Sequence, residues 1–374
     1  MPILAELVDA VVGVDTHRDS HEVEIAHPSG AVIATRRIDN DTSGYALLLA
    51  WILDHAPGPR LVVSIEGTRS YGIGLARAVA AAGMTVIECE QPHRKARRGR
   101  GKSDPIDAHL AVLTALRTDP DRLPAPRADG DREALRILLG ARDELSTTST
   151  AQTNRLRALL LAGDDQDRDR ARGRLTATVL AALARRRPPR DATRDQGVRQ
   201  AEIRRLALAL REARRALAAN HTQLQTILDE LAPGLTDQTG LGPVTAAQAV
   251  VSFSHPGRCR NEAAFAALAG TSPLPASSGR TVRHRLNRGG DRALNRAIHT
   301  IAVTRARCCP TTRAYITRRT AEGKTDKEIR RCLKRYITRQ LYRTLTHTMT
   351  NTPPIPPANP PKTVKTPLSP IPPC

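Results

Sequence analysis

The stretch VDAVVGVD (residues 8–15) decides the fold of the N-terminal region, because it is an almost continuous apolar run that ends on an aspartate. A run of this kind is typical of a central strand buried on both faces of a sheet. The segment HEVEIAHPSGAVIATRRI (21–38) follows it with two alternating halves around Pro28-Ser29-Gly30, which is a hairpin signal. We therefore expect an antiparallel hairpin next to a buried strand.

The segments up to residue 120 continue to alternate between helix and strand. Helical periodicity marks TSGYALLLAWILDHA (42–56) and YGIGLARAVAAAG (71–83), and apolar runs predict strands at RLVVSIEG (60–67) and MTVIECE (84–90). The order hairpin, helix, strand, helix, strand, helix resembles a ribonuclease-H-like fold. We predict an α/β domain of this type over residues 1–127.

Composition and charge restrict the class of partner. The chain has 374 residues and a formal net charge of +21, with 58 Lys and Arg against 37 Asp and Glu, which favours a polyanionic partner. No stretch reaches the roughly 18 apolar residues of a membrane span, so we expect nucleic acid and no membrane. Aromatic residues make up only 2%, so binding should use arginine and backbone amides rather than base stacking. The six cysteines lack CxxC spacing, which fits reduced thiols in a cytoplasmic protein.

The middle region, residues 128–232, has the composition of long charged helices. Within 198–232 one apolar series recurs every seven residues and a second fills the intervening positions: Ile203, Leu210, Leu217, Leu224 and Leu231, with Leu206, Ala213, Asn220 and Ile227. The helix could pack within its own domain. We favour a coiled coil between protomers, giving a homodimer or tetramer, because no neighbouring sequence offers enough apolar surface to cover the seam.

The region 233–350 forms a second basic unit, predicted to be mainly helical. TDQTGLGPVTAAQAVV (236–251) has the pattern of a helix-hairpin-helix element, in which Gly240 and Gly242 allow a tight turn and helix-opening amides face a phosphate. A simple turn between helices is the alternative. The tail 351–374 is proline-rich and is predicted to be disordered.

Two aspartates in KSDPIDA (102–108) have two interpretations. Asp104 can cap a helix that continues with Pro105, and Asp107 then falls at the acidic position of a capping box. Asp15 and Glu66, however, close two apolar strands, where α/β sheets place their ligand sites. Four converging carboxylates would repel one another without cations, and their oxygens suit Mg²⁺ or Mn²⁺. We therefore predict that Asp15, Glu66, Asp104 and Asp107 form a metal site for phosphodiester chemistry.

The basic run HRKARRGRGK (93–102) precedes this acidic helix. We predict that it contacts phosphates, with a purely solvated loop as the alternative; its cations are Arg94, Lys95, Arg97, Arg98, Arg100 and Lys102. His17, Asp19 and Glu22 follow Asp15 and are interpreted as solvated turn residues.

Taken together, these motifs resemble a known family. GVDTHRD, SIEGT and KSDPIDA look like the DEDD set of the RuvC-like domain in insertion-sequence-110 family transposases. LGPVTAAQAVVSF, FAALAGTSPLPASSGRTVRHRL and NRGGDRALNRAI resemble the C-terminal transposase domain of that family. The two domains cover nearly all of residues 10–305 in the family's order. The arginine-rich stretch 164–197 and the proline tail have no counterpart that we can map.

The resemblance implies an enzyme that transposes DNA, and it assigns roles to residues. Asp15, Glu66, Asp104 and Asp107 would be the catalytic metal ligands, and Ser278 in ASSGR the nucleophile, with Ser277 beside it. Arginines near this serine would contact nucleic acid: Arg280, Arg283, Arg285 and Arg288.

The family also implies a reaction course and partners. Cleavage would give a phosphoserine–DNA intermediate, and a structured RNA encoded by the element would pair with target and donor DNA. The metal site of one protomer could act with the serine of another, in a bacterial, nucleoid-associated protein.

Two other functions remain open at this level. A RuvC-like metal-dependent nuclease or resolvase would use water as the nucleophile, and Ser278 would only contact DNA. A non-catalytic nucleic-acid-binding protein would use the four acids as helix caps.

Overall fold

The computed structural model describes residues 3–89, 104–120, 123–187, 192–275, 284–285, 287 and 289–349, without the side chains of Asp104, Pro105 and His284. Within these ranges the chain forms two compact units. The first comprises residues up to 130, together with 253–261 and the residues from 346 on. The second comprises 131–252 and 262–345. The middle and C-terminal regions of the sequence analysis thus lie mainly in one unit.

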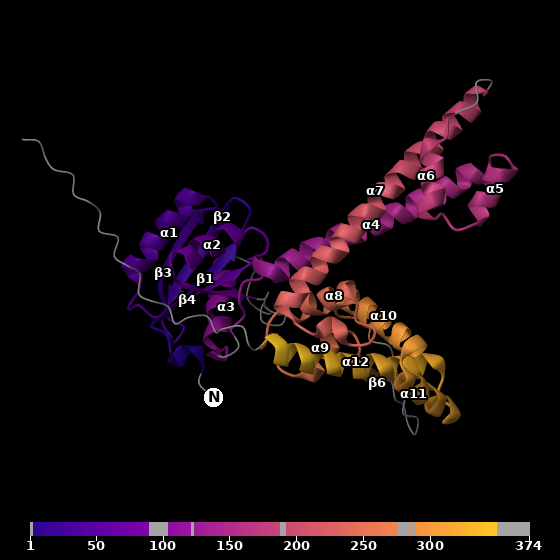
Figure 1. The fold of residues 1–374 in the computed structure, drawn as a ribbon. Helices are drawn as coiled ribbons and strands as arrows, with labels where there is room; N and C mark the ends of the chain where they lie inside the picture. Colours follow the sequence, from indigo (N-terminus) through magenta and orange to yellow (C-terminus); the bar gives the residue numbers. More distant parts are fainter. Residues whose placement is uncertain are drawn as a thin grey trace, which may run out of the picture. The chain divides into compact units, whose positions relative to one another are not determined.

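A five-stranded sheet forms the centre of the first unit (Figure 1). Its order is β3-β2-β1-β4-β5, in which β1, β4 and β5 run parallel and β2 is antiparallel to both neighbours. The strands are β1 Ala10–Thr16, β2 Ser20–Ala26, β3 Val32–Asp39, β4 Leu61–Glu66 and β5 Thr85–Cys89. The predicted order of strands and helices is confirmed. It could be predicted because each buried strand has its own apolar pattern in the sequence.

Helices cover both faces of this sheet, after the short 3-10 helix η1 Leu4–Glu6. Helices α1 Thr42–His55 and α2 Ile73–Ala81 pack on the face that carries Val12, Val14 and Ile65. Helix α3 Asp104–Leu116 packs on the opposite face, against Val11 and Val62. Residues that alternate along β1 therefore serve two separate cores, as expected for a fully covered strand.

Two long helices dominate the N-terminal part of the second unit. Helices α4 and α7 run side by side along much of their length (Figure 1), and α5 and α6 lie between them in sequence. Their bounds are α4 Gly130–Leu161, α5 Asp165–Arg172, α6 Ala177–Arg185 and α7 Arg194–Leu231.

The apolar seam of α7 is covered by the chain itself. Ile203, Leu206 and Leu210 are buried in one cluster with side chains from α4 and α6, among them Leu156 and Leu180. Farther along, the Asn220 side-chain amide donates to the Leu138 carbonyl oxygen of α4 at 2.9 Å. The inference that no neighbouring segment could cover the seam is therefore wrong. The seam therefore gives no support to a coiled coil between protomers, and the homodimer or tetramer that was inferred from it stays a prediction.

The remaining elements of the second unit are short helices and a two-stranded ladder. After the 3-10 helix η3 Leu235–Asp237 come α8 Pro243–Phe253, α9 Glu262–Leu268, β6 Leu274–Pro275, β7 His284–Arg285, α10 Arg292–Cys308, α11 Pro310–Ala321 and α12 Asp326–Met349. Strands β6 and β7 are antiparallel and flank the segment that contains Ser278. In the described part of the chain, no helix is both long enough and apolar enough to span a bilayer.

Candidate active site

Asp15 and Glu66 lie at the same end of the sheet, at the carboxyl ends of the neighbouring strands β1 and β4. The parallel register of β1 and β4 pairs Val14 with Ile65, so Asp15 and Glu66 are the next positions along the two strands. The antiparallel register pairs Asp15 with Glu22 of β2 on its other side. Paired residues share a face of a sheet, so this edge presents a row of three carboxylates with Asp15 in the middle.

The row lies on the face that carries α3. Gly13 and Ser64 precede Asp15 and Glu66 by two residues and therefore face the same way. A Cβ atom added at Gly13 would fall 2.3 Å from the Ala108 carbonyl oxygen of α3. The Ser64 hydroxyl donates to the Ala111 carbonyl oxygen at 3.1 Å. The absence of a side chain at Gly13 thus lets α3 approach the sheet closely, one pleat away from the acids.

The direction of α3 brings its first turn to the acidic edge. Its last turn, with Ala115 and Leu116, packs against the early strand residues Val11 and Val62. The helix therefore runs antiparallel to β1 and β4, and its N-terminal turn lies toward the ends of these strands that carry Asp15 and Glu66. Asp104 is the first residue of the helix and Asp107 lies one turn further along.

The described acids have surroundings that suit a hard cation. Asp15 and Asp107 are buried, and the ring of His17 lies 3.2 Å from an Asp15 oxygen. The Glu66 Oε2 atom is buried without a hydrogen-bond partner among the described residues. A buried carboxylate oxygen without a partner is costly, and a divalent cation would remove that cost. Among the described side chains, which exclude that of Asp104, no three potential ligands lie close enough together to hold a metal ion.

The interpretation of Glu22 as a solvated turn residue is wrong, since it lies in β2 beside Asp15. Two further residues close to the site, Glu24 and His109, were not predicted from the sequence. Glu24, which pairs with Gly13, is buried, and its carboxylate lies 2.7 Å from the Nδ1 atom of His109 in α3. This contact ties α3 to β2 two residues after Asp107. The alternation in HEVEIA was a usable signal, because it places Glu22 and Glu24 on one face.

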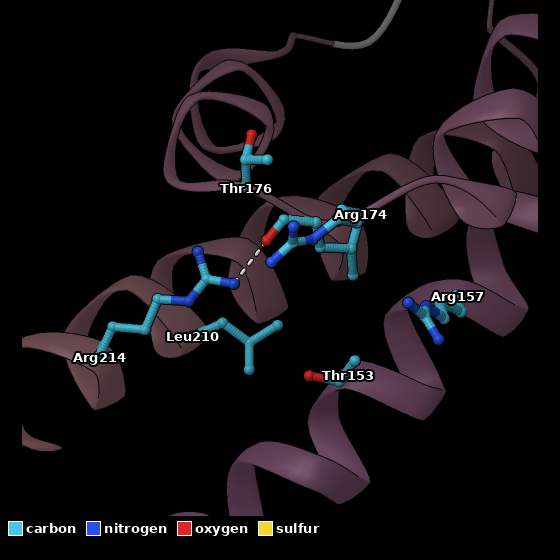
Figure 2. A pocket seen from close by; sticks show the side chains of 7 residues that line it. Thr153, Arg157, Arg174, Thr176, Leu210 and Arg214 are labelled. Atoms are coloured by element: carbon cyan, nitrogen blue, oxygen red, sulfur yellow. Dashed lines mark hydrogen bonds between the residues drawn. The ribbon is translucent and has the colours of Figure 1, made fainter. Parts of the chain in front are cut away.

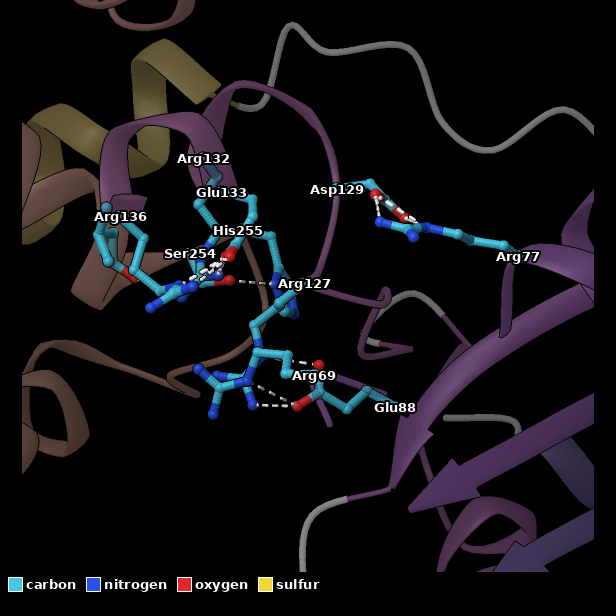
Figure 3. A network of polar contacts seen from close by, with 11 residues as sticks. Arg69, Arg77, Glu88, Arg127, Asp129, Arg132, Glu133, Arg136, Ser254 and His255 are labelled. Atoms are coloured by element: carbon cyan, nitrogen blue, oxygen red, sulfur yellow. Dashed lines mark hydrogen bonds and ion pairs between the residues drawn. The ribbon is translucent and has the colours of Figure 1, made fainter. Parts of the chain in front are cut away.

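A buried ion pair holds the outer strand of this sheet. The Arg127 guanidinium donates to both carboxylate oxygens of Glu88 in β5, and Arg69 lies 3.8 Å from one of them (Figure 3). Burial raises the pKa of the Glu88 carboxyl, but the hydrogen bonds and charge of Arg127, together with the Arg69 charge, outweigh burial. The pKa of Glu88 is therefore below its usual value.

Many of the predicted nucleic-acid contacts lie outside the described residues. These are the cations of segment 93–102 and three arginines near Ser278: Arg94, Lys95, Arg97, Arg98, Arg100, Lys102, Arg280, Arg283 and Arg288. The predicted nucleophile Ser278 and its neighbour Ser277 also lie outside the described residues. Arg285 is described; it lies in β7, pairs with Leu274 and is exposed. The roles of all these residues stay predictions.

The second unit has a strongly cationic cavity of about 740 Å³. Its lining includes Pro273 and Arg285, which lie on either side of Ser278 in the sequence. Seven cationic side chains face it against one acid, Glu328: Arg285, Arg319, Lys324, Arg331, Lys334, Arg335 and Arg339. Burial lowers the pKa of Lys334, whose ammonium donates to Asn295 Oδ1 at 2.5 Å. Such a surface fits a phosphate backbone.

Helix α12 supplies most of this charge, although its arginines were not predicted from the sequence to form a site. Glu328, Arg331, Arg335 and Arg339 recur every three or four residues and so line one face of the helix. That spacing was the signal available in the sequence.

The predicted turn at Gly240 is present and borders another cavity. Gly240 has φ +87°, in the region that favours glycine, and an added Cβ atom would fall 3.2 Å from the Ile301 carbonyl oxygen. The Gly242 amide donates to the Thr245 hydroxyl at 3.1 Å. The cavity beside this turn measures about 540 Å³ and includes Arg142 and His221. Contact of this turn with a phosphate stays a prediction.

Comparison with known protein families gives two matches. A family model for the DEDD transposase of IS110, described as "Transposase", matches residues 12–162. A model described as "Transposase IS116/IS110/IS902 family" matches residues 233–317. The first covers β1 through α4, with all four predicted acids, and the second covers η3 through most of α11, with Ser278.

Two curated proteins of Streptomyces coelicolor are similar to parts of the chain. An uncharacterized 43.6 kDa protein of insertion element IS110 is 36% identical over 120 residues, which are 31% of this chain and 29% of the relative. A mini-circle protein described as a candidate transposase for IS117 is 28% identical over 155 residues, which are 40% of this chain and 37% of the relative. The similarity thus spans about a third of the length of each relative.

Proposed function

We propose that this chain, which belongs to the IS110 family of transposases, cuts and rejoins DNA strands, with the acids at the ends of β1 and β4 as metal ligands and Ser278 as the nucleophile. The observation that carries the proposal is the row at the end of β1 and β4, where Asp15 and Glu66 are neighbours and α3 presents its first turn. The RuvC-like character of this domain is part of the proposal. It is supported by the strand order, with β2 antiparallel between β1 and β3.

The four acids would hold Mg²⁺, or Mn²⁺ in its place. Asp15 and Glu66 would contribute oxygens from the sheet, and Asp104 and Asp107 from α3. The buried Glu66 Oε2 atom supports this, because it has no hydrogen-bond partner in the described part of the chain and a cation would satisfy it. Bound there, such an ion would lower the pKa of an attacking hydroxyl and stabilise the charge on the oxygen that leaves.

Ser278 would act as the nucleophile. Its hydroxyl oxygen forms a bond to a backbone phosphorus, the bond from that phosphorus to one strand end breaks, and the leaving oxygen takes up a proton. A hydroxyl of a new strand end then attacks the phosphoserine, the new phosphodiester forms, and the serine hydroxyl is regenerated. Each step exchanges one phosphoester for another, so no nucleotide hydrolysis is required.

DNA would be one partner and a structured guide RNA encoded by the element a second. The net charge of +21 and the seven cations around the cavity beside β7 support a polyanionic partner. The low aromatic content supports recognition of backbones, with base pairing to the RNA selecting the sequence.

The test is a labelled DNA duplex that carries the element ends flanking the gene, incubated with the full chain, Mg²⁺ and RNA transcribed from the same flank. We expect a covalent protein–DNA adduct and joined strands. Ser278→Ala should abolish both products, while the adjacent Ser277→Ala should retain them and serves as the matched control. Asp15→Asn should also abolish both products.

Each competing function predicts a different result. Strand cleavage that persists in Ser278→Ala, without an adduct, would identify a metal-dependent nuclease that uses water. DNA binding without any cleavage, unchanged by Asp15→Asn and by Mg²⁺, would identify a non-catalytic binding protein.

A further inference from the structure

A cavity of about 490 Å³ lies where α4, α7 and the turn between α5 and α6 meet (Figure 2). Its lining has three guanidinium groups, two hydroxyl groups and two leucines: Thr153, Arg157, Arg174, Leu175, Thr176, Leu210 and Arg214. No acidic residue is among them. Five of the seven lie between residues 163 and 232, in the part of the chain that neither family model matches.

The three arginines come from three different elements. Arg157 projects from α4, Arg214 from α7, and Arg174 from the turn between α5 and α6 (Figure 2). The three side chains therefore do not come together merely because they lie on one face of one helix. The packing of three separate backbone segments brings them to the same cavity. Arg214 donates to the Leu175 carbonyl oxygen, which fixes this turn against α7.

Carboxylates in the described part of the chain do not neutralise the positive charge of the cavity. Each aspartate of the acidic helix α5 already has an arginine partner outside the cavity: Asp165 with Arg168, Asp167 with Arg170 and Arg186, and Asp169 with Arg172. Across the described part of the chain, no carboxylate pairs with Arg157, Arg174 or Arg214.

The apolar part of the cavity lining strengthens the positive electrostatic potential inside the cavity. Leu175 and Leu210 are buried members of the core between α4, α6 and α7. A low-dielectric wall beneath charged groups increases their attraction for an anion. Thr176 caps α6, and its hydroxyl accepts from the Val179 amide, so the positive end of that helix dipole also points toward the cavity.

We propose that this cavity, the inter-helix arginine site, binds phosphate groups of a nucleic-acid backbone. Arginine forks match phosphate oxygens, and the threonine hydroxyls can donate to the same group. The lining has no aromatic side chain on which a base could stack, so the site contacts the backbone without selecting sequence. The proposal rests on the proposed function, because it takes the nucleic acid handled by this protein as the ligand.

The experiment measures binding of the full chain to a DNA duplex and to an RNA duplex of the same sequence, as a function of salt concentration. The test variant is Arg157→Gln with Arg174→Gln; Arg214 is left intact because it holds the Leu175 carbonyl. The matched control, Arg205→Gln with Arg215→Gln, also removes two charges from the same helical region. Those two arginines pair with Glu202 and Glu212, outside the site.

We expect the test variant to lose about tenfold in affinity at about 0.1 M salt, with the slope of log affinity against log salt reduced by about 1 to 2. The control should stay within about twofold of the wild type. Arg157→Lys with Arg174→Lys should keep most of the slope, since it keeps the charges. Loss on the RNA duplex alone assigns the phosphate to RNA, and loss on the DNA duplex alone assigns it to DNA.

An unchanged slope for the test variant on both duplexes would overturn the site while leaving the proposed function intact. Equal losses in the test and control variants would also overturn it, since the effect would then reflect overall charge. Failure of the wild-type chain to bind either duplex would instead count against the proposed function itself.

Discussion

Gly13 in β1 lies directly against Ala108 in α3, so close that a Cβ atom at Gly13 would fall 2.3 Å from the Ala108 carbonyl oxygen. The same added atom would fall 2.6 Å from a methyl group of Val112. Asp15 follows Gly13 by two residues on the same face, and Asp107 directly precedes Ala108. The close approach of strand and helix therefore sets the separation between the sheet-borne and the helix-borne acids.

Gly13→Ala should displace α3 and lower both stability and activity. Forcing a methyl group into this contact should lower the free energy of unfolding by about 1–3 kcal/mol, as overpacked cores do. Strand cleavage should fall further than the loss of folded protein explains, because the acids move apart. Urea unfolding followed by circular dichroism, with cleavage assayed on the folded fraction, measures both effects.

The matched control is Gly140→Ala. Gly140 lies in α4, and apart from its own helix backbone no described atom would lie within 4 Å of an added Cβ atom, so alanine should stabilise the helix by about 0.5–1 kcal/mol. A Gly13→Ala variant as stable and active as the wild type would show that α3 is not held at this distance.

Glu66→Gln should remove metal-dependent stabilisation. With Mg²⁺ at tenfold above its dissociation constant, the wild-type fold should gain about 1.4 kcal/mol, seen as a higher melting temperature. The variant should show no such gain. Without metal it should melt no lower than the wild type, because Glu66 Oε2 has no partner to lose within the described structure.

Asp19→Asn is the control for charge alone. Asp19 is exposed and pairs with Arg18 at 2.9 Å, so its variant should keep the full Mg²⁺ effect. A Glu66→Gln variant that Mg²⁺ still stabilises to the wild-type extent would remove Glu66 from the ligand set.

Arg127→Met should destabilise the first unit strongly, because it leaves Glu88 buried without its main partner. The expected loss is about 3–5 kcal/mol at neutral pH, measured by chemical unfolding. Arg77→Met removes the exposed pair of Arg77 with Asp129 (Figure 3) and should change the unfolding midpoint little. Equal effects of the two variants would mean that burial of the Glu88 pair contributes nothing.

The same ion pair predicts a pH dependence. The pKa of Glu88 is lower in the folded state than its usual value of 4.5, so the ionised carboxylate stabilises the fold above that value. This contribution is lost as the pH falls from 4.5 through the lowered folded-state pKa. Glu88→Gln should therefore flatten the decline in stability in this acid range, and an unchanged decline would contradict the assignment.

The sequence predicted the first unit well because its signals are local. VDAVVGVD and LVVSIE each carry enough apolar residues to mark a buried strand, and both end on an acid. Because β1 and β4 are parallel, Asp15 and Glu66 lie at the same end of the sheet, independently of the conformation of the connecting loops. The start of α3 at Asp104 was likewise readable from the Asp-Pro pair.

Contacts between distant segments were not predictable in the same way. The heptad pattern correctly placed Ile203, Leu210 and Leu224 on a buried face but could not show what covers them. Ile203 and Leu210 pack in one cluster with Leu156 of α4, about 50 positions earlier, and the apolar pattern of α4 is weak. Glu24 and His109 are 85 residues apart in the chain. Each of them, considered alone in the sequence, has the character of an ordinary surface residue.

Asn220→Leu tests directly what the α7 seam contacts. In the structure the Asn220 amide donates to Leu138, and its carbonyl oxygen accepts from Arg142 at 3.3 Å, both within one chain. The variant should therefore lower the free energy of unfolding by about 1–3 kcal/mol, because it leaves buried polar groups without their partner. The molecular mass in solution should not change.

An asparagine that set the register of a coiled coil between protomers would behave differently, since its replacement by leucine commonly alters the oligomeric state. Light scattering coupled to size exclusion separates the two, and a shift in mass with unchanged stability would place Asn220 at a subunit interface.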